Sequence, residues 1–321
     1  MGAEWSRMLL PIGQRASRRS NTLRTHRKLS GMIITALMLG AIGNTANAQQ
    51  GLSEEERMQR VRTMMAAPNP LEPSDSIWIE ELTYMEVRDR IAAGTTTVII
   101  PTGGIEENGP FLATGKHNYI LEALCPVIAG DLGNALCAPI VPFVPEGSID
   151  PPSGAMHFPG SITVRDETFH ALLDDIASSL KQHGFKDIIL IGDSGGNQQG
   201  MQAVAETLNA RWAGSETRAH FLAEFYQPGW QVTEDYTEKE LGIVETKNDG
   251  HHDDIWVTAM MMVTDPETVR YRQRMAADLA SINGVDISSL EDSIELGNKM
   301  IAVRGAYSAD AIRAAIAGDA E

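Results

Sequence analysis

Apolar, β-branched runs alternate along this chain with stretches in which apolar residues recur at helical spacing. The runs predict strands at 95–103, 135–144, 186–192 and 218–226, and the stretches between them predict helices at 117–133, 165–184 and 200–213. The predicted strands are apolar almost throughout, which is typical of parallel strands buried on both faces. We therefore predict an α/β fold of three layers, with a mostly parallel sheet between two layers of helices.

The N-terminal residues have a different pattern. A basic segment precedes the apolar run "MIITALMLGAIG" (32–43), and Ala46 and Ala48 then form an A-x-A cleavage site. This order predicts a secretory signal peptide over residues 1–48. The apolar run is shorter than the ~20 residues that span a bilayer, and a retained membrane anchor is the alternative interpretation. We expect a periplasmic or secreted protein, with an N-terminal extension at 49–75 and one α/β domain at 76–321.

The chain is acidic, with a formal net charge of −17, and residues 1–48 hold seven of its 26 Lys and Arg residues. The rest of the chain is therefore more acidic still. Such a surface repels nucleic acid and anionic membranes, so we expect a small-molecule partner, no nucleic acid, and no membrane contact after signal removal. Two cysteines, Cys125 and Cys137, either pair in an oxidising compartment or remain buried thiols, and the sequence leaves both open.

Two polar loops follow predicted strands. The first, "PTGGIEENGPFLATGKH" (101–117), holds Glu106, Asn108 and His117, and the second, "GDSGGNQQG" (192–200), holds Asp193 and Ser194. In parallel sheets, ligand sites lie at the carboxyl ends of strands. Carboxylates and imidazoles there are natural ligands of a divalent transition metal, and such a metal activates water for hydrolysis. A polar turn without a metal is the alternative for each loop.

A third polar cluster, "NDGHHDDIW" (248–256), contains His251, Asp253 and Asp254. Four consecutive His and Asp residues are uncommon, although such runs also occur in surface loops without a metal. The string "GDSGG" in the second loop matches the segment around the nucleophile of trypsin-like proteases. That fold is all-β, and the strand–helix alternation of this chain contradicts it.

Four segments in this order resemble the creatininase (creatinine amidohydrolase) family: "PTGGIEENGPFLATGKH" (101–117), "GAMHFPGSI" (154–162), "HGFKDIILIGDSGGN" (183–197) and "HHDDIWVTAMM" (251–261). The resemblance covers residues 78–265. It implies a creatininase-like fold and a metal-dependent amidohydrolase activity. It also implies closed homo-oligomers, commonly hexamers.

The metal-ligand motif that the resemblance implies is altered in this chain. The first Glu of the motif is kept as Glu106. One His of the motif is replaced by Asn108 and the closing Asp by His117. A second His is replaced by Ser194, which has Asp193 beside it. The loss of two imidazoles argues against a two-metal centre, while the exchanged residues keep ligand chemistry in the loops.

A further Glu of the family motif falls on Trp256, and Asp253 or Asp254 can substitute for it. The resemblance therefore implies one divalent metal per subunit, with Zn as the first choice and Mn or Fe as alternatives. Its predicted ligands are Glu106, His117, Asp193 and Asp253.

The predicted function is an exported amidohydrolase that cleaves the C–N bond of a small amide or cyclic amide by metal-activated water. The predicted catalytic residues are His251, Glu106 and Asp254. The predicted substrate-binding residues are Asn108, Phe111, Ser194, Gly195 and Trp256. Two alternatives remain open: a non-catalytic small-molecule-binding protein on the same fold, and a metal-independent hydrolase or lyase that uses a Glu106/His117 pair or Ser194.

Overall fold

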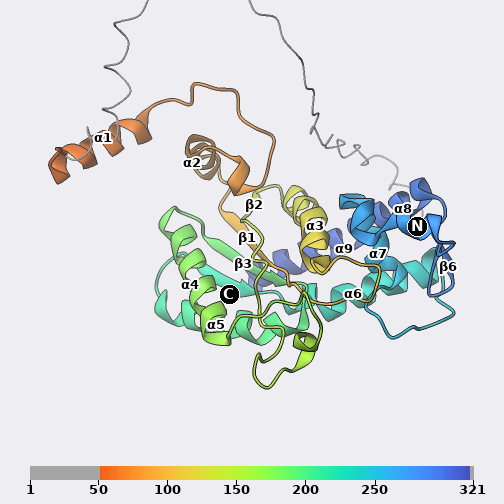
Figure 1. The fold of residues 1–321 in the computed structure, drawn as a ribbon. Coiled ribbons are helices and arrows are strands. Elements are labelled where there is room, and N and C mark those ends of the chain that lie inside the picture. The colour runs from red at the N-terminus through yellow and green to blue at the C-terminus, as the bar shows by residue number, and fades with distance from the viewer. Residues whose placement is uncertain (1–50, 319–321) are drawn as a thin grey trace, which may run out of the picture. The chain divides into compact units, whose positions relative to one another are not determined.

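The computed structural model describes residues 51–318, and the chain divides after Ala66 into two units (Figure 1). In the first unit, the described residues form helix α1 (Glu54–Ala66), none of whose side chains is buried. The predicted signal peptide, residues 1–48, lies outside the described residues. Within residues 51–318, no helix is both long and apolar enough to cross a membrane.

The second unit is built on a sheet of four parallel strands in the order β2-β1-β3-β4. These are β1 (Thr97–Thr102), β2 (Ala135–Cys137), β3 (Asp187–Gly192) and β4 (Arg218–Phe221). The two central strands pair along their whole length, from Thr97 opposite Asp187 to Thr102 opposite Gly192. Both therefore end at the same edge of the sheet. The predicted parallel α/β architecture is confirmed.

Two predicted strands are shorter than expected. The run 135–144 ends as a strand at Cys137, because Pro139 and Pro142 have no N–H to donate to a neighbouring strand. Beyond it, Val141 keeps a sheet-like contact, donating its N–H to the carbonyl of Pro101 at 2.9 Å. The run 218–226 ends at Phe221 and continues as the 3-10 turn Ala223–Phe225.

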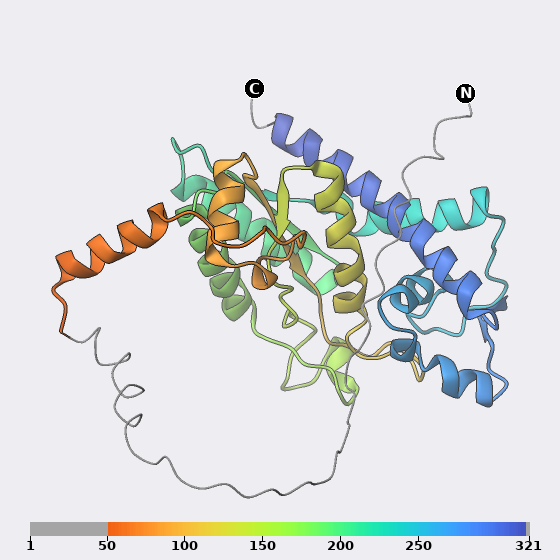
Figure 2. The ribbon, with the colours of Figure 1, turned by 90° about the horizontal axis from the view of Figure 1, so that it is seen from above.

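Alternate residues of the strands point to opposite faces of the sheet, and each face is covered by helices (Figures 1 and 2). One core contains Val98 and Ile188 with helices α4 (Asp166–Gln182) and α5 (Gln198–Arg211), and α2 (Tyr84–Ala92) packs at its edge. The other contains Ile99 and Ile189 with α3 (Lys116–Leu132), α7 (Ile255–Thr264) and α9 (Leu290–Gly318). The three layers match the prediction.

Local sequence signals set the bounds of these helices. Helix α2 begins with a capping box, in which Thr83 and Glu86 each accept a hydrogen bond from the other's backbone N–H. Helix α3 ends at Gly133, whose positive φ of 75° favours glycine. The remaining elements are α6 (Gln227–Asp235), α8 (Tyr271–Ala276) and the hairpin β5 (Ser281–Ile282) and β6 (Val285–Asp286).

A disulfide joins Cys125 in α3 to Cys137 at the end of β2. The structure thereby decides between the two states that the sequence left open. The bond fixes the outer strand of the sheet to the helix that precedes it in the chain.

Candidate active site

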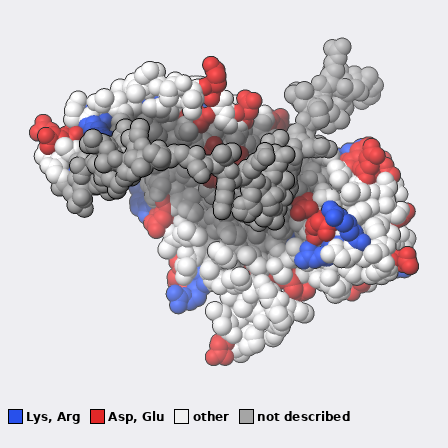
Figure 3. Space-filling model, turned by 45° about the horizontal axis from the view of Figure 1, so that its top comes forward, with Lys and Arg blue, Asp and Glu red and all other residues white. Residues whose placement is uncertain are grey.

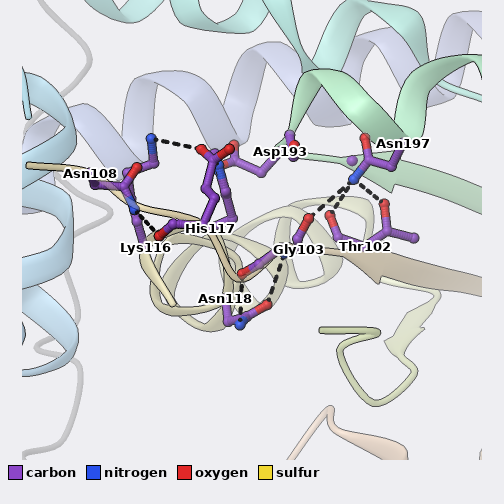
Figure 4. A network of polar contacts seen from close by, with 12 residues as sticks. Thr102, Gly103, Asn108, Lys116, His117, Asn118, Asp193 and Asn197 are labelled. Atoms are coloured by element: carbon purple, nitrogen blue, oxygen red, sulfur yellow. Dashed lines mark hydrogen bonds and ion pairs between the residues drawn. The ribbon is translucent and has the colours of Figure 1, made fainter. Parts of the chain in front are cut away.

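Two asparagines fix the loop that follows β1 (Figure 4), one by joining it to the loop after β3 and the other by joining it to α3. Asn197, in the loop after β3, donates from Nδ2 to the carbonyls of Thr102 and Gly103 at 3.1 and 3.2 Å. Asn118, in α3, accepts from the N–H of Gly104 at 3.3 Å and donates to its carbonyl at 3.2 Å. The carboxyl edge of the sheet is therefore a fixed platform, as the positions of the polar loops predicted.

Two glycines allow neighbouring side chains to lie directly against the backbone of the loop that follows β1. A Cβ on Gly103 would lie 1.9 Å from Asn118 Oδ1, and a Cβ on Gly104 would lie 2.2 Å from Glu146 Oε1. Any larger residue would displace the asparagine or the carboxyl group. These two glycines of the loop 101–117 are thus required by contact with their neighbours.

His117 connects two carboxylates at the start of α3. Its Nδ1 lies 2.8 Å from Asp193 Oδ2, and its Nε2 lies 2.7 Å from Glu106 Oε1 (Figure 4). Burial and the charge of Lys116 lower the pKa of His117, but the hydrogen bonds to the two carboxylates outweigh them and raise it above the ordinary value. A cationic imidazolium with both ring nitrogens donating fits this arrangement.

Asp193 is held on its other side by Arg304 from α9. Arg304 Nη2 donates to Asp193 Oδ1 at 2.7 Å and to the carbonyl of Phe225 at 3.0 Å. The guanidinium also lies over two aromatic rings, 4.0 Å from the centre of Trp230 and 4.4 Å from that of Phe225. Both oxygens of Asp193 are therefore engaged by protein partners.

Glu106 lies between two cationic side chains. Besides His117, the ammonium of Lys116 lies 3.6 Å from Glu106 Oε1, and its side chain is 5% exposed. Burial raises the pKa of Glu106, but the hydrogen bond and charge of His117 and the charge of Lys116 prevail and lower it to about 2. Glu106 is ionised. Of the three linked side chains Glu106, His117 and Asp193, Glu106 is the most exposed, at 15%.

Glu146 is a second carboxyl group beside Glu106, supplied by the loop that follows β2. Its Oε2 accepts from Ser194 Oγ at 3.3 Å, whereas its buried Oε1 has no hydrogen-bond partner among the described residues. Burial and the charge of Glu106 raise the pKa of Glu146 to about 8. The site therefore pairs an ionised carboxylate with a carboxyl group that is neutral at pH 7.

Three of the predicted substrate-binding residues lie at this edge. Asn108 is buried and donates from Nδ2 to the carbonyl of Glu106 at 3.0 Å, while its Oδ1 has no partner within residues 51–318. Ser194 donates to Glu146. Gly195 lies against the hydroxyl of Tyr226, which would be 3.0 Å from a Cβ at this position.

The aromatic residues predicted to bind substrate are engaged in packing. Trp256 lies against Trp230, with ring centres 4.3 Å apart. Phe111 lies under Arg274, whose guanidinium is 4.3 Å from the ring centre. Both rings are thus occupied by protein neighbours.

The third polar cluster lies close enough to the site for the charge of His252 to act on Glu106. His251 is exposed and covers Gly109, where a Cβ would lie 2.7 Å from its Cγ. Asp253 is buried among the charges of Asp249 and Arg274. Asp254 precedes α7, and its charge acts on Lys116. Among the contacts of the described residues, none of the three forms a hydrogen bond to the Glu106–His117–Asp193 chain.

The predicted metal ligands are not assembled as a metal site. Glu106, His117 and Asp193 converge, but no hydrogen bond or ion pair among the described residues joins the Asp253 side chain to them, and its buried Oδ1 has no partner there. Residues 51–318 contain no group of three or more His, Cys, Asp or Glu side chains placed to hold a metal ion. Both ring nitrogens of His117 are taken by carboxylates, whereas a ligating histidine keeps one nitrogen for the metal. The arrangement of these side chains, rather than their chemistry, does not fit a divalent metal.

Three residues of the site were not assigned by sequence reasoning: Glu146, Lys116 and Arg304. Glu146 follows an apolar run as Glu106 does, so the same rule of strand ends would have indicated it. Lys116 precedes His117 directly. A single Arg on the apolar face of a helix is a signal for a buried charge that needs a partner, and Arg304 in α9 is such a residue.

Comparison with known proteins gives one consistent family. The sequence model described as creatininase, creatinine amidohydrolase, matches residues 80–314. The creatinine amidohydrolase of Pseudomonas putida is 24% identical over 210 residues, which make up 61% of this chain and 75% of that protein.

Solved creatininase structures share the fold. A mutant creatininase described as a Zn-Zn type superposes with a TM-score of 0.55 at 22% identity, covering 75% of this chain and 98% of that one. A structure described as creatininase Mn gives the same TM-score and identity, covering 74% and 98%. Zn and Mn are thus named for these related proteins.

Proposed function

Because this chain belongs to the creatininase family, we propose that it is a hydrolase that cleaves the C–N bond of a small amide or cyclic amide. The observation that carries the proposal is the pair of carboxyl groups at the carboxyl edge of the sheet, Glu106 held by His117 and Glu146 held by Ser194. Two carboxyl groups of opposite protonation state, side by side, are the equipment of general acid–base catalysis.

In the proposed reaction, water attacks the carbonyl carbon of the amide and gives a proton to ionised Glu106. Neutral Glu146 gives its proton to the leaving nitrogen as the C–N bond breaks, so that a carboxylic acid and an amine are released. A proton then passes from Glu106 to Glu146, which restores both groups. His117 and Asp193 orient the Glu106 carboxylate through the two short hydrogen bonds. The arrangement of these side chains does not fit a metal, and no step passes through one.

Export of the protein is part of the proposal. The disulfide between Cys125 and Cys137 supports it, because disulfides persist in the periplasm and outside the cell but are rare in the cytosol. The proposed partner is a small molecule, and on the face shown in Figure 3 the basic side chains that are visible form only small groups beside acidic ones. A nucleic-acid-binding face needs a continuous basic patch.

We also propose a homo-oligomer. Four large apolar side chains are exposed on the segment that carries Glu146 and its flanking loop: Phe143, Ile149, Phe158 and Ile162. Exposed apolar groups of this kind support an interface between subunits. Light scattering of the purified protein tests this point.

The catalytic proposal is tested with the purified protein on a panel of cyclic and open-chain amides, creatinine included, by measuring the released acid and amine. Glu106→Gln should lower the rate by about 10²–10⁴-fold, because it removes the proton acceptor. Glu107→Gln is the matched control, because Glu107 is the adjacent carboxylate and accepts from the N–H of Gly109 in the same loop. Equal losses in both variants would contradict the proposal. Tight binding of an amide without turnover would instead favour a non-catalytic binding protein.

A further inference from the structure

We propose that this site has no resident divalent metal, and that Lys116 and Arg304 supply the positive charge that compensates Glu106 and Asp193. The catalytic part of this inference rests on the proposed hydrolase function, whereas its metal-binding part rests on contacts alone. It separates this chain from the relatives for which Zn or Mn is named.

The donor atoms of His117 and Asp193 are already in use. Both nitrogens of His117 and both oxygens of Asp193 have protein partners at 2.7–2.8 Å. A metal would have to replace the bond between His117 and Glu106, and among the described residues no group of three His, Cys, Asp or Glu side chains is placed to hold it. Structural and catalytic zinc sites take at least three protein ligands.

The charges around the site also oppose a divalent cation. Arg304 and Asp193 are both fully buried and 2.7 Å apart, so the guanidinium already compensates the charge of this carboxylate. Lys116 is 4% exposed and lies 3.6 Å from Glu106. A divalent cation at Glu106 would therefore be placed close to the ammonium of Lys116, and like charges at such distances repel strongly where water is scarce.

The positions at which the resemblance implies histidine carry residues with other contacts. Asn108 donates from its amide nitrogen to the carbonyl of Glu106 and offers a metal only its amide oxygen, which is not among the usual ligands of zinc. Ser194 donates its hydroxyl to Glu146. The loop that carries Ser194 also has no room for a larger side chain at Gly196, because a Cβ there would lie 1.9 Å from the carbonyl oxygen of Pro145. The exchanged residues leave no imidazole in reserve at these two positions.

The direct test is the metal content of the protein, expressed with Zn and Mn in the medium and purified without chelators. We expect far less than one metal per chain by inductively coupled plasma mass spectrometry. Added Zn or Mn should leave the Tm unchanged, whereas a metal held at a hundred times its dissociation constant would raise the Tm by roughly 5–10 °C in a domain of this size. A stoichiometric metal that is lost in the His117→Ala variant would overturn the proposal.

Lys116→Met tests the role of the ammonium. It should lower kcat by about 10–100-fold, as the loss of a buried electrostatic group does, and neither Zn nor Mn should restore the rate. Lys299→Met is the control, because Lys299 is an exposed lysine paired with Glu295 on the surface of α9. Full activity of Lys116→Met, or its rescue by metal, would overturn the proposal.

These readouts distinguish the two proposals from each other. A metal-free protein that turns over no amide would leave the metal-binding inference intact and contradict the proposed function. A protein that hydrolyses an amide, retains one Zn per chain and loses its activity with a chelator would support the function and overturn the inference.

Discussion

Arg304 and Asp193 form an ion pair in which both side chains are fully buried, with Nη2 of the arginine 2.7 Å from Oδ1 of the aspartate. The pair joins α9 to the residue that follows β3, so the C-terminal helix contributes directly to the site. Removing one partner of a buried pair leaves the other charge without compensation. Arg304→Met should therefore lower the free energy of unfolding by about 3–5 kcal/mol, measured by urea denaturation.

The exposed ion pair of Arg313 with Asp131 provides the comparison, since the arginine side chain is 45% exposed and the aspartate 42%. Arg313→Met should change the free energy of unfolding by less than about 1 kcal/mol. If the two variants lost equal stability, the buried pair would have no special structural role.

The disulfide should contribute substantially to the free energy of unfolding. Cys125 and Cys137 are 12 residues apart in sequence, and closing a loop of this size contributes about 3 kcal/mol in the chain-entropy account. Reduction of the native protein should lower its Tm. The double variant Cys125→Ala, Cys137→Ala should start at the lower Tm and not respond to the reductant, and a response in that variant would show that the reductant acts elsewhere.

The sequence predicts the strands and loops of the sheet edge better than it predicts their contacts with the C-terminal helix α9. The apolar runs of β1 and β3 and the loops after them were readable, because strands buried on both faces have a plain pattern and a parallel sheet collects its loops at one edge. Glu106, His117 and Asp193 were therefore expected to meet. Their partner Arg304 is 111 residues beyond Asp193, and only the packing of α9 on the sheet brings it there.

The third polar cluster shows the reverse case. Asp253 has the carboxylate of a metal ligand, yet the charges that most affect its pKa are those of Asp249 and Arg274. Composition cannot say which way a loop turns its carboxylates, because that depends on where α7 and α8 pack. The sequence likewise did not indicate that Trp256 contacts Trp230, and its role in binding substrate stays a prediction.

Glu146 should make the free energy of unfolding fall as pH rises. Its pKa is about 8 in the folded protein against an ordinary 4.5, so the folded state keeps a proton that the unfolded chain loses. This stabilisation is complete below pH 4.5 and is lost as pH rises through 8, with a slope of at most about 1.4 kcal/mol per pH unit. Glu106 acts in the opposite sense, since its pKa is about 2 and its contribution is lost as pH falls below 4.5.

Denaturation curves recorded between pH 4.5 and about 8 give the change of the free energy of unfolding with pH for wild type and for Glu146→Gln. In the variant, the free energy of unfolding should fall less steeply as pH rises between these values, because the amide cannot titrate. Glu295→Gln, which removes an exposed carboxylate of α9, should leave the slope as in wild type. An unchanged slope in Glu146→Gln would mean that Glu146 is already ionised in the folded protein at neutral pH.

Gly196 should be needed to keep Glu146 in place. A Cβ at position 196 would lie 1.9 Å from the carbonyl oxygen of Pro145, the residue before Glu146. Gly196→Ala therefore has to push the loop that carries the carboxyl group away from the site. We expect it to lower the free energy of unfolding by about 1–3 kcal/mol and the hydrolytic rate by about 100-fold, because displacements near 1 Å have this effect on positioned catalytic groups.

Gly130→Ala separates this clash from a general effect of losing a glycine. Gly130 is exposed in the interior of α3, and a Cβ at this position would meet no neighbouring atom of the described residues within 4 Å. Alanine there should raise the free energy of unfolding by about 0.5–1 kcal/mol, because glycine is the weaker helix former, and should leave the rate unchanged. Wild-type activity in Gly196→Ala would mean that the loop can move without carrying Glu146 with it, and Glu146 would then have no positional role in the reaction.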